Sequence, residues 1–526
     1  MKKKEDRLVI CYCLAAAAIL LTVCSRSSFL YVFNNWDDAN SYMTVGKSIF
    51  RGLVPYRDLF DQKGILLYFF YGLASLVSAT DFHAVWVLEV IAAAASLCAV
   101  HRILTLYLKT RVMPVVLTPL IGAVIYSSRC FYRGGSAEEF LFPFLLWGMF
   151  LSFRYFRRTY PAAVSYRTVL TGGILAGCVF HIKFSSLGLF FAWMAVMFFA
   201  LLIGARDPRR AFASCLVFLA GMGIATLPWL IYFGVNHAVA DWFHVYIYRN
   251  VFEYGKTLAL GERIHLIYRT LIDHALNNRP AAMLLLFGFF YLFVCAVITV
   301  LRRGKGEGGL LGLSIPEFLN AAMQVLFLTL VIFFGGVSLP YYSFPITAFA
   351  VAGGIAAGNL IEWITERFRS KSPAAPEEKG KKDRKWVGIA GFGAAALAAS
   401  ALYALSVSGN PSFRQVRAED FWLFRFRDHI AASGVQDPHL INVGCFDAGL
   451  YTVTDSVPVC YYFQTQTLGM EEVHHEQKEC IRQGIPDFIL SRDEEYPYTD
   501  GYRLVLTEEA RLPDEQHIYY LYQKKE

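Results

Sequence analysis

Charged residues are scarce in this chain of 526 residues: Asp, Glu, Lys and Arg together make up 17% of it, whereas 56% is hydrophobic. Mean hydropathy is +0.41. That balance excludes an ordinary soluble domain and indicates a polytopic membrane protein. The aromatic share of 16% is typical of interfacial Trp and Tyr belts. The net charge of +7 does not indicate nucleic-acid binding, because the basic residues lie mostly in short loops.

Signatures of cofactor and metal chemistry are also missing. No Gly-rich phosphate loop follows a predicted strand, so no nucleotide-sugar fold is expected. None of the eleven Cys residues forms a pair with metal-ligand spacing. The sequence therefore does not exclude a divalent metal but gives no evidence for one, and no other cofactor is expected. Cys445, Cys460 and Cys480 lie in the polar tail. Because an odd number cannot all pair internally, we expect no disulfide framework.

Eleven apolar runs approach the roughly 20 residues that a membrane-spanning helix needs. A shorter run, 64–80, follows the first polar loop, and whether it crosses the membrane decides the topology of everything after it. The eleven runs are residues 8–28, 84–107, 112–128, 139–156, 168–183, 185–204, 211–233, 281–301, 316–335, 344–366 and 386–408.

The distribution of Lys and Arg indicates that 64–80 does not cross, because cytoplasmic loops are enriched in these residues. Lys2 to Lys4 place the N-terminus in the cytoplasm, so 29–63 lies outside. If 64–80 is juxtamembrane or re-entrant, every later basic cluster also falls inside. These clusters are Lys109 and Arg111; Arg154, Arg157 and Arg158; Arg206, Arg209 and Arg210; Arg302, Arg303 and Lys305; and the basic linker after the tenth run. We therefore expect about eleven spans in a multi-pass protein of the cell membrane.

Two domains are expected. Residues 1–408 form a transmembrane domain, with a first extracytoplasmic loop and juxtamembrane helices at 28–83 and a Pro-containing cytoplasmic linker at 367–385. Residues 409–526 are polar and contain alternating runs, which predict strands of a small α/β domain. The strand candidates are 439–443, 487–490 and 502–506. The span count places this domain outside the cell.

The first outer loop is rich in charge beside hydrocarbon, where charge is costly, and this makes it a candidate functional site. It holds Asp37, Asp38, Asp58, Asp61 and Lys63. A carboxylate can act as general base on an acceptor hydroxyl, and Lys or Arg can hold a phosphate-bearing donor. Other outer segments add Arg129, Arg133, Glu138, Glu139, Lys183, Tyr341 and Tyr342.

Each of these groups also has a structural interpretation. Asp38 could cap a helix predicted at 40–50. Asp58 and Asp61 could form ion pairs with Arg57 and Lys63. Glu138 and Glu139 could lie at a helix N-terminus, which favours anions in any case. Lys183 could extend its side chain to the membrane interface, and Tyr341 and Tyr342 could belong to the interfacial aromatic belt. Convergence of so many groups on one membrane face favours a functional interpretation.

Motifs along essentially the whole chain carry a family resemblance. They are Trp36-Asp37-Asp38-Ala39-Asn40, Gly46, the stretch Gly52 to Gly64 with Pro55-Tyr56-Arg57-Asp58 and Asp61-Gln62-Lys63-Gly64, Gly134-Gly135-Ser136-Ala137-Glu138-Glu139-Phe140, Ile182-Lys183, Tyr461-Tyr462-Phe463-Gln464 and Gly484-Ile485-Pro486-Asp487-Phe488-Ile489. In these motifs the chain resembles the GT-C superfamily of integral-membrane glycosyltransferases. That superfamily includes the protein O-mannosyltransferases, the lipid A aminoarabinose transferases and the bacterial branch labelled glycosyltransferase 39 or RgtA-like.

The resemblance implies an enzyme that uses a polyprenyl-phosphate sugar donor on the outer face of the cytoplasmic membrane. Its acceptor would be a hydroxyl on a cell-envelope glycan, lipid or protein, and its partners would be that donor, that acceptor and the lipid bilayer. The resemblance implies an acidic catalytic base in the first loop, for which Asp38 and Asp37 compete. It places a second acidic position at Glu139 or Glu138.

The expected substrate-binding residues are Lys63, Asp61, Tyr56, Arg129, Arg133, Lys183, Tyr341 and Tyr342. Lys63 matches a family lysine expected near the donor phosphate. The chain departs from the family pattern at Ile65, where Pro is usual, and at His83, where the mannosyltransferase and aminoarabinose branches carry Arg. Phosphate binding would then rely on Arg129, Arg133 or Lys183.

A lipid-linked glycan transporter or flippase is the alternative function. It would need charged residues along a pathway through the spans, and the candidates Glu89, His101 and Arg102 are few. A non-catalytic scaffold that presents the outer domain is a third interpretation.

Overall fold

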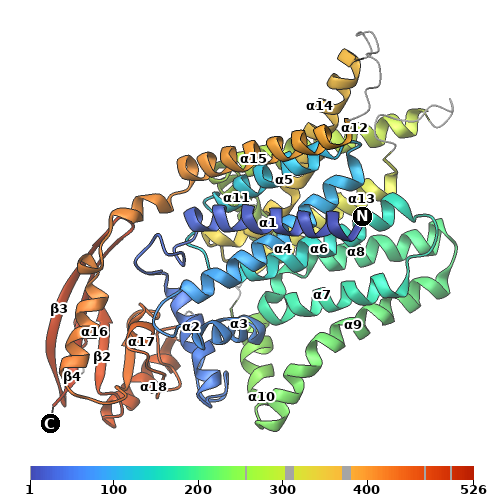
Figure 1. Cartoon of the computed structure of the whole chain (residues 1–526). Helices are drawn as coiled ribbons and strands as arrows, with labels where there is room; N and C mark the ends of the chain where they lie inside the picture. Colours follow the sequence, from blue (N-terminus) through green and yellow to red (C-terminus); the bar gives the residue numbers. More distant parts are fainter. Residues whose placement is uncertain are drawn as a thin grey trace.

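The computed structural model describes residues 2–254, 258–302, 313–369, 381–466, 470–497 and 500–525. It is a helical bundle with a small sheet at one end (Figure 1). The helices of the bundle are α1 (Lys2–Cys24), α2 (Asp37–Phe50), α3 (Ile65–Ser75), α4 (His83–Tyr107), α5 (Val112–Tyr126), α6 (Ala137–Arg158), α7 (Tyr166–Lys183), α8 (Gly188–Phe199), α9 (Pro208–Val235), α10 (Val239–Trp242), α11 (Leu260–Asn277), α12 (Arg279–Arg302), α13 (Ile315–Phe333), α14 (Ala350–Arg369) and α15 (Lys381–Val407).

Eight helical segments among the described residues are long and apolar enough to cross a membrane, which confirms a multi-pass membrane protein. They coincide with α1, α4, α7, α9, α12, α13, α14 and α15. Of the other three expected spans, α5 and α8 are shorter apolar helices, and α6 has sufficient length but is less apolar. The count of eleven spans stays a prediction.

Helix α3 is too short to cross a bilayer. Its 11 residues rise about 16 Å, roughly half of the ~30 Å hydrocarbon layer. This length agrees with the expectation that 64–80 does not span. Helix α3 packs closely on α2 through two glycines: a Cβ on Gly46 would lie 2.5 Å from the Tyr68 carbonyl oxygen, and one on Gly72 would lie 2.6 Å from the Gly46 carbonyl oxygen.

Several segments that the charge pattern placed on one side of the membrane meet at one end of the bundle. Arg111 pairs with Glu5 at 3.0 Å, and Lys109 pairs with Glu366 at 3.1 Å. These pairs join the N-terminus, the α4–α5 turn and the end of α14. The cytoplasmic orientation of this end stays a prediction. Most of the predicted linker 367–385 lies outside the described residues, which omit 370–380.

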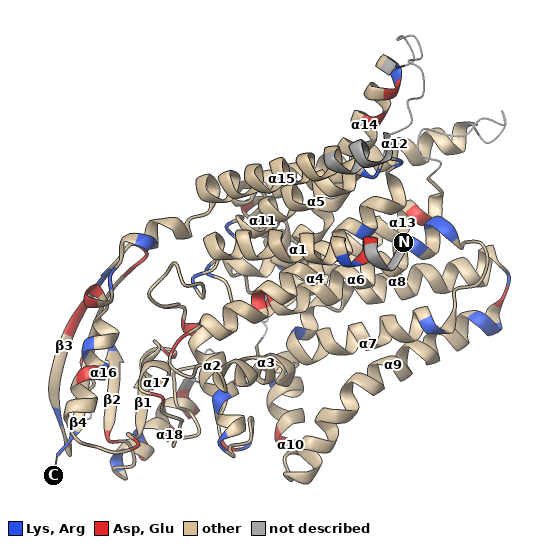
Figure 2. Ribbon diagram, viewed as in Figure 1, with Lys and Arg blue, Asp and Glu red and all other residues tan. Residues whose placement is uncertain are grey.

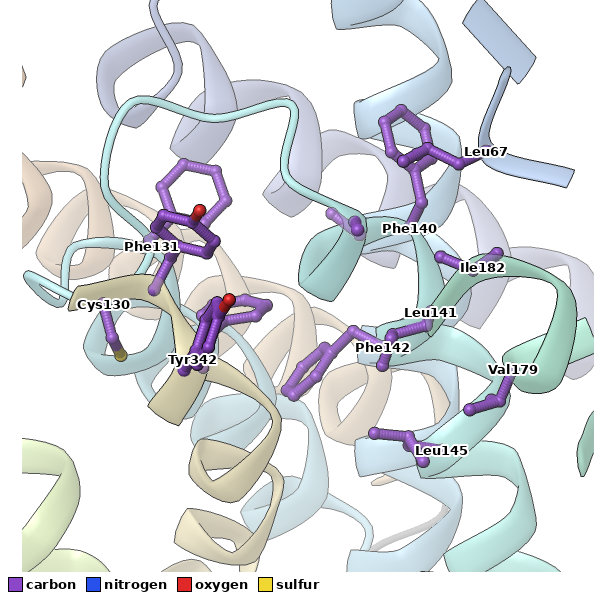
Figure 3. Close-up of a cluster of buried hydrophobic side chains, with 14 of the residues drawn as sticks. Leu67, Cys130, Phe131, Phe140, Leu141, Phe142, Leu145, Val179, Ile182 and Tyr342 are labelled. Atoms are coloured by element: carbon purple, nitrogen blue, oxygen red, sulfur yellow. The ribbon is translucent and has the colours of Figure 1, made fainter. Parts of the chain in front are cut away.

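Charge is unevenly distributed over the fold. Figure 2 shows long uncharged stretches through most bundle helices, with charged residues gathered near helix ends and in the C-terminal sheet. Figure 3 shows one of the apolar clusters inside the bundle, where Leu141 and Leu145 of α6 lie near Val179 of α7. Because α6 packs on α7, the helix ends that carry Glu138 and Lys183 are held together.

Residues 409–525 form what we call the C-terminal unit, and its four-stranded mixed sheet confirms the predicted sheet. The strand order is β1-β2-β4-β3, with β1 and β2 parallel and the other pairs antiparallel. The strands are β1 (Leu440–Val443), β2 (Phe488–Arg492), β3 (Tyr502–Leu512) and β4 (Glu515–Lys524), and the helices are α16 (Trp422–Ala432), α17 (Leu450–Val453) and α18 (Met470–Arg482).

A disulfide joins Cys460 to Cys480 in the C-terminal unit, with the two Cα atoms 6.3 Å apart. The expectation of no disulfide was wrong. An odd count only requires that one thiol stay free, and that thiol is the buried Cys445. Because disulfides persist in oxidising compartments, this bond agrees with the predicted placement of the unit outside the cell.

One polar face of α2 docks on the C-terminal unit. Three side chains at three-residue spacing, and therefore on one helix face, donate buried hydrogen bonds to it. They are Ser41 Oγ to Gln464 Oε1 (2.7 Å), Thr44 Oγ1 to Asp447 Oδ2 (2.6 Å) and Lys47 Nζ to the Tyr451 carbonyl oxygen (2.8 Å). The C-terminal unit thereby fixes the helix whose first turn holds Asp37 and Asp38.

Candidate active site

Asp38 lies in the first turn of α2, where exposed amide groups favour a carboxylate. Its Oδ2 accepts hydrogen bonds from the hydroxyls of Tyr341 (2.7 Å) and Tyr42 (3.1 Å). The interpretation of Asp38 as a helix cap was wrong, because Trp36 occupies the cap position and no side chain caps the helix. The two tyrosines instead hold the carboxylate in a fixed orientation.

Asp38 faces a cavity of about 160 Å³, which we call the central cavity. Asp61, Lys63, Tyr341 and Tyr342 also line it, so five of the predicted site residues meet there. The C-terminal unit closes the cavity with Phe446, Gln464 and Gln466.

Lys63 is the cation of the central cavity. Burial lowers the pKa of Lys63, but the nearby carboxylates of Asp38 and Asp61 outweigh burial and raise it above its usual value. Burial raises the pKa of Asp61, and the charge of Lys63 opposes that shift. The ammonium group of Lys63 therefore stays protonated across the physiological range.

The turn that carries Lys63 is pressed against the end of α7. The Gly64 amide donates to the Ile182 carbonyl oxygen at 3.1 Å. A Cβ on Gly64 would lie only 2.1 Å from the carbonyl oxygen of His181. Glycine is therefore required at this position, and its close approach brings Lys63 toward Lys183.

Lys183 and Glu138 form a buried ion pair between the ends of α7 and α6. The ammonium of Lys183 also lies 3.5 Å from the centroid of the Tyr342 ring, a cation–π contact. Glu139 points elsewhere: it is buried, accepts a hydrogen bond from the Gly135 amide at 2.8 Å and lies beside Glu89.

A larger cavity of about 750 Å³, the apolar cavity, adjoins the central cavity. The two share Gln62, Lys63, Tyr254 and Tyr342 as lining residues. Lys183 also lines the apolar cavity, and much of the remaining wall is apolar. That wall includes Phe327, Leu330, Val331 and Ile332 of α13. A largely apolar space thus has Lys63 and Lys183 in its wall.

On the other side of Asp38 lies a cavity of about 230 Å³, the polar cavity. Asp37 lines it and pairs with Arg492 of β2 at 3.1 Å. Burial raises the pKa of Asp37, and the charge of Arg492 opposes that shift. Arg133 also lines this cavity and pairs with Asp514 at 2.8 Å. Asp38 and Tyr341 belong to both the polar and the central cavity.

The remaining predicted residues lie around this arrangement. Tyr56 is buried and donates a hydrogen bond to the Lys63 carbonyl oxygen at 2.6 Å, so it supports the loop. Asp58 pairs with Arg57 at 2.7 Å near the surface, as its structural interpretation expected. Arg129 is exposed, donates to Asn277 Oδ1 and is not among the described lining residues of the three cavities.

Sequence reasoning missed several residues that surround Asp38. Tyr42 had a usable signal, since it follows Asp38 by four residues on a helix that the sequence predicted. Gln464 belongs to the Tyr461-Tyr462-Phe463-Gln464 motif but was given no role in the site. Phe446 and Arg492 had no signal, because they reach the site from the C-terminal unit through tertiary docking.

The candidates for metal or transport chemistry are dispersed. Among the described residues, no group of three or more His, Cys, Asp or Glu could hold a metal ion. Glu89 accepts a hydrogen bond from Ser25 at 2.8 Å, whereas Arg102 pairs with Asp6 near the N-terminus.

The whole-chain arrangement is similar to solved membrane-protein structures. ArnT from Cupriavidus metallidurans bound to undecaprenyl phosphate matches with a TM-score of 0.57 and 12% identity, over 96% of this chain and 97% of that chain. The chain has the fold of ArnT. The resemblance expected from the sequence is thus confirmed at the level of the fold.

Two further structures share this fold. The apo state of ArnT matches with a TM-score of 0.54 and 12% identity, over 98% of both chains. The Archaeoglobus fulgidus oligosaccharyltransferase tethered with an acceptor peptide matches with a TM-score of 0.50 and 12% identity, over 93% of this chain and 69% of that one. No protein-family model matches this chain, and no curated protein matches its sequence.

Proposed function

We propose that this protein is a membrane glycosyltransferase that moves a sugar from a polyprenyl-phosphate donor to an acceptor hydroxyl at the outer face of the cytoplasmic membrane. The observation that carries the proposal is the position of Asp38. Its carboxylate lines the central cavity, which shares lining residues both with an apolar cavity that contains two lysines and with a polar cavity.

The apolar cavity suits the donor. An isoprenoid chain needs an apolar wall, and its phosphate needs cations, which Lys63 and Lys183 in that wall supply. ArnT, which has a similar fold, was solved with undecaprenyl phosphate bound. In this proposal the donor phosphate lies near Lys63, and the sugar occupies the central cavity.

The reaction then needs one base and one stabilised leaving group. Asp38 accepts the proton of the acceptor hydroxyl, whose oxygen forms a bond to the anomeric carbon of the sugar. The bond from that carbon to the phosphate oxygen breaks, and the polyprenyl phosphate departs with the bonding electrons. Because phosphate is already a stable anion, charge neutralisation by Lys63 contributes more than proton donation.

Asp38 is a better base than its neighbours. Both of its hydrogen bonds end on Oδ2, which leaves Oδ1 to receive the proton. Asp37 is paired with Arg492 and lines only the polar cavity. Glu138 is held by Lys183, and Glu139 by the Gly135 amide, so both suit positioning roles.

The test supplies purified protein in liposomes with a panel of polyprenyl-phosphate sugars and with cell-envelope glycans, lipids and proteins as hydroxyl acceptors, and it measures release of polyprenyl phosphate. Asp38→Asn should lower the rate by about 10² to 10⁴-fold, as expected for loss of a general base. Asp58→Asn is the matched control, because Asp58 lies in the same loop and pairs with Arg57 near the surface, and this variant should retain most activity. Full activity in Asp38→Asn would refute the base assignment, and failure of the unaltered protein to use any donor would refute the function.

A transport function has less support. The candidate charges Glu89 and Arg102 are held in separate contacts with Ser25 and Asp6. Mass spectrometry of envelope glycans and lipid-linked sugars from a deletion strain separates the two functions. A transferase deletion should remove one sugar from a finished glycan, whereas a flippase deletion should remove the whole glycan.

A further inference from the structure

The polar cavity has the lining of a carbohydrate site. Trp36, Tyr132 and Phe446 present aromatic surface to it, and Trp36 contacts Tyr132 edge to face at 5.3 Å between ring centroids. Aromatic faces pack well against the C–H faces of a sugar ring, and carboxylates accept hydrogen bonds from its hydroxyls. Both kinds of group are present here.

The charges of the polar cavity disfavour an anionic ligand. Among its described lining residues, four are carboxylates and two are arginines, and both arginines are already paired. Arg133 is held by Asp514 at 2.8 Å, and Arg492 by Asp37 at 3.1 Å. A phosphate or carboxylate ligand would have to break these pairs and would then face the remaining carboxylates. A neutral polyhydroxyl ligand keeps them intact.

The size and position of the polar cavity fit one sugar unit. Its volume of about 230 Å³ is below the ~300–1,000 Å³ of pockets that enclose drug-sized ligands. Asp38, Leu339, Tyr341 and Phe446 line both this cavity and the central cavity. A hydroxyl of a bound sugar unit would therefore reach the Asp38 carboxylate.

We propose that the polar cavity binds an uncharged sugar unit of the acceptor, so that the acceptor is a neutral glycan. This inference rests on the proposed glycosyl transfer for its role, although sugar binding itself does not need a donor. The C-terminal unit supplies Arg492 and Glu515 to the cavity and so takes part in acceptor recognition.

Glu515 is the residue that best tests this site. Its carboxylate accepts hydrogen bonds from Asn35 Nδ2 (2.6 Å) and from the Tyr519 hydroxyl (2.8 Å), so its position is fixed at the start of β4. Glu515→Gln keeps the shape of the side chain and removes its charge. Glu509→Gln is the matched control, because Glu509 lies on the neighbouring strand, is exposed and pairs with Arg511.

The experiment applies the labelled full-length protein in detergent, without donor, to an array of neutral glycans, phosphorylated or sialylated glycans and poly(glycerol phosphate). We expect saturable retention on a subset of the neutral glycans. Glu515→Gln should weaken that retention by at least about tenfold, and Glu509→Gln should leave it unchanged. His517→Ala is a second cavity variant in case Glu515→Gln fails to fold.

Three results would overturn the proposal. They are retention on anionic glycans alone, no retention on any glycan, and neutral-glycan retention that neither cavity variant weakens. The outcome is separable from that of the proposed function. Binding of neutral glycans without any sugar transfer would refute the proposed transferase function and support the sugar-binding site. Transfer of sugar to an anionic acceptor would support the transferase function and refute the neutral acceptor.

Discussion

The hydroxyl of Tyr341, at the start of a late span, donates a 2.7 Å hydrogen bond to the carboxylate of Asp38, in the first turn of α2. The two residues are separated by 303 positions in sequence. Their contact joins α2 to the segment before α14 at the point where the central and polar cavities share lining residues.

Removal of that hydroxyl should impair catalysis without unfolding the protein. A hydrogen bond to a charged group contributes about 1.5–3 kcal/mol, so Tyr341→Phe should lower kcat by about 10- to 100-fold. The apparent KM for the donor should change little, since the ring remains. Polyprenyl phosphate release measures both quantities. Tyr342→Phe is the control, because the Tyr342 hydroxyl contacts Tyr254 and not Asp38. Equal losses in both variants would argue against orientation of the base by Tyr341.

Variants of the Lys183–Glu138 ion pair can distinguish a structural role of Lys183 from a role in donor binding. Lys183→Met leaves the buried Glu138 carboxylate without its cation, which should cost about 3–5 kcal/mol of unfolding free energy. Adding Glu138→Gln should restore most of that stability, as measured by thermal unfolding in detergent. Donor use should stay impaired in the double variant if Lys183 also neutralises the phosphate. Recovery of full activity would limit Lys183 to a structural role.

The fold was predictable because its signal lies in long apolar runs and in charge bias. Each signal is local in the sequence, and each can be recognised without knowing how the helices pack. The gathering of Asp38, Lys63 and Tyr341 followed from the predicted sidedness of two loops, the first outer loop and the segment before the tenth apolar run. The partners from the C-terminal unit did not follow, since Arg492 reaches Asp37 across 455 positions through a docking that no local pattern records. The Cys460–Cys480 pair depends on the same tertiary arrangement.

The buried Asp447 should make stability depend on pH. Burial raises its pKa from 3.8 to about 6. Between these values the folded chain binds more protons than the unfolded chain, so unfolding free energy falls as pH rises from about 4 to about 6. The difference corresponds to about 3 kcal/mol.

Asp447→Asn should remove this contribution. Relative to the unaltered protein, the variant should gain about 3 kcal/mol between pH 4 and pH 7, as measured by thermal unfolding across that range. Asp428→Asn, at an exposed position of α16, should show no such gain. A constant difference between the Asp447 variant and the unaltered protein would mean that Asp447 titrates normally.

The predicted orientation can be tested by cysteine labelling. Lys109→Cys should resist a membrane-impermeant thiol reagent in intact cells, because the α4–α5 turn is expected in the cytoplasm. Ser412→Cys, at an exposed position of the C-terminal unit, should react. Both should react after the cells are permeabilised. Labelling of residue 109 from outside would reverse the predicted topology.

The docking of α2 also limits how such proteins can be recombined. The face of α2 that meets the C-terminal unit is polar and buried, with Ser41, Thr44 and Lys47 matched to specific acceptors. A chimaera cut at residue 408 would pair this helix with a foreign surface and leave those donors unmatched. To exchange acceptor specificity between related chains, one would therefore have to transfer α2 and the C-terminal unit together, although the two are encoded by distant parts of the gene.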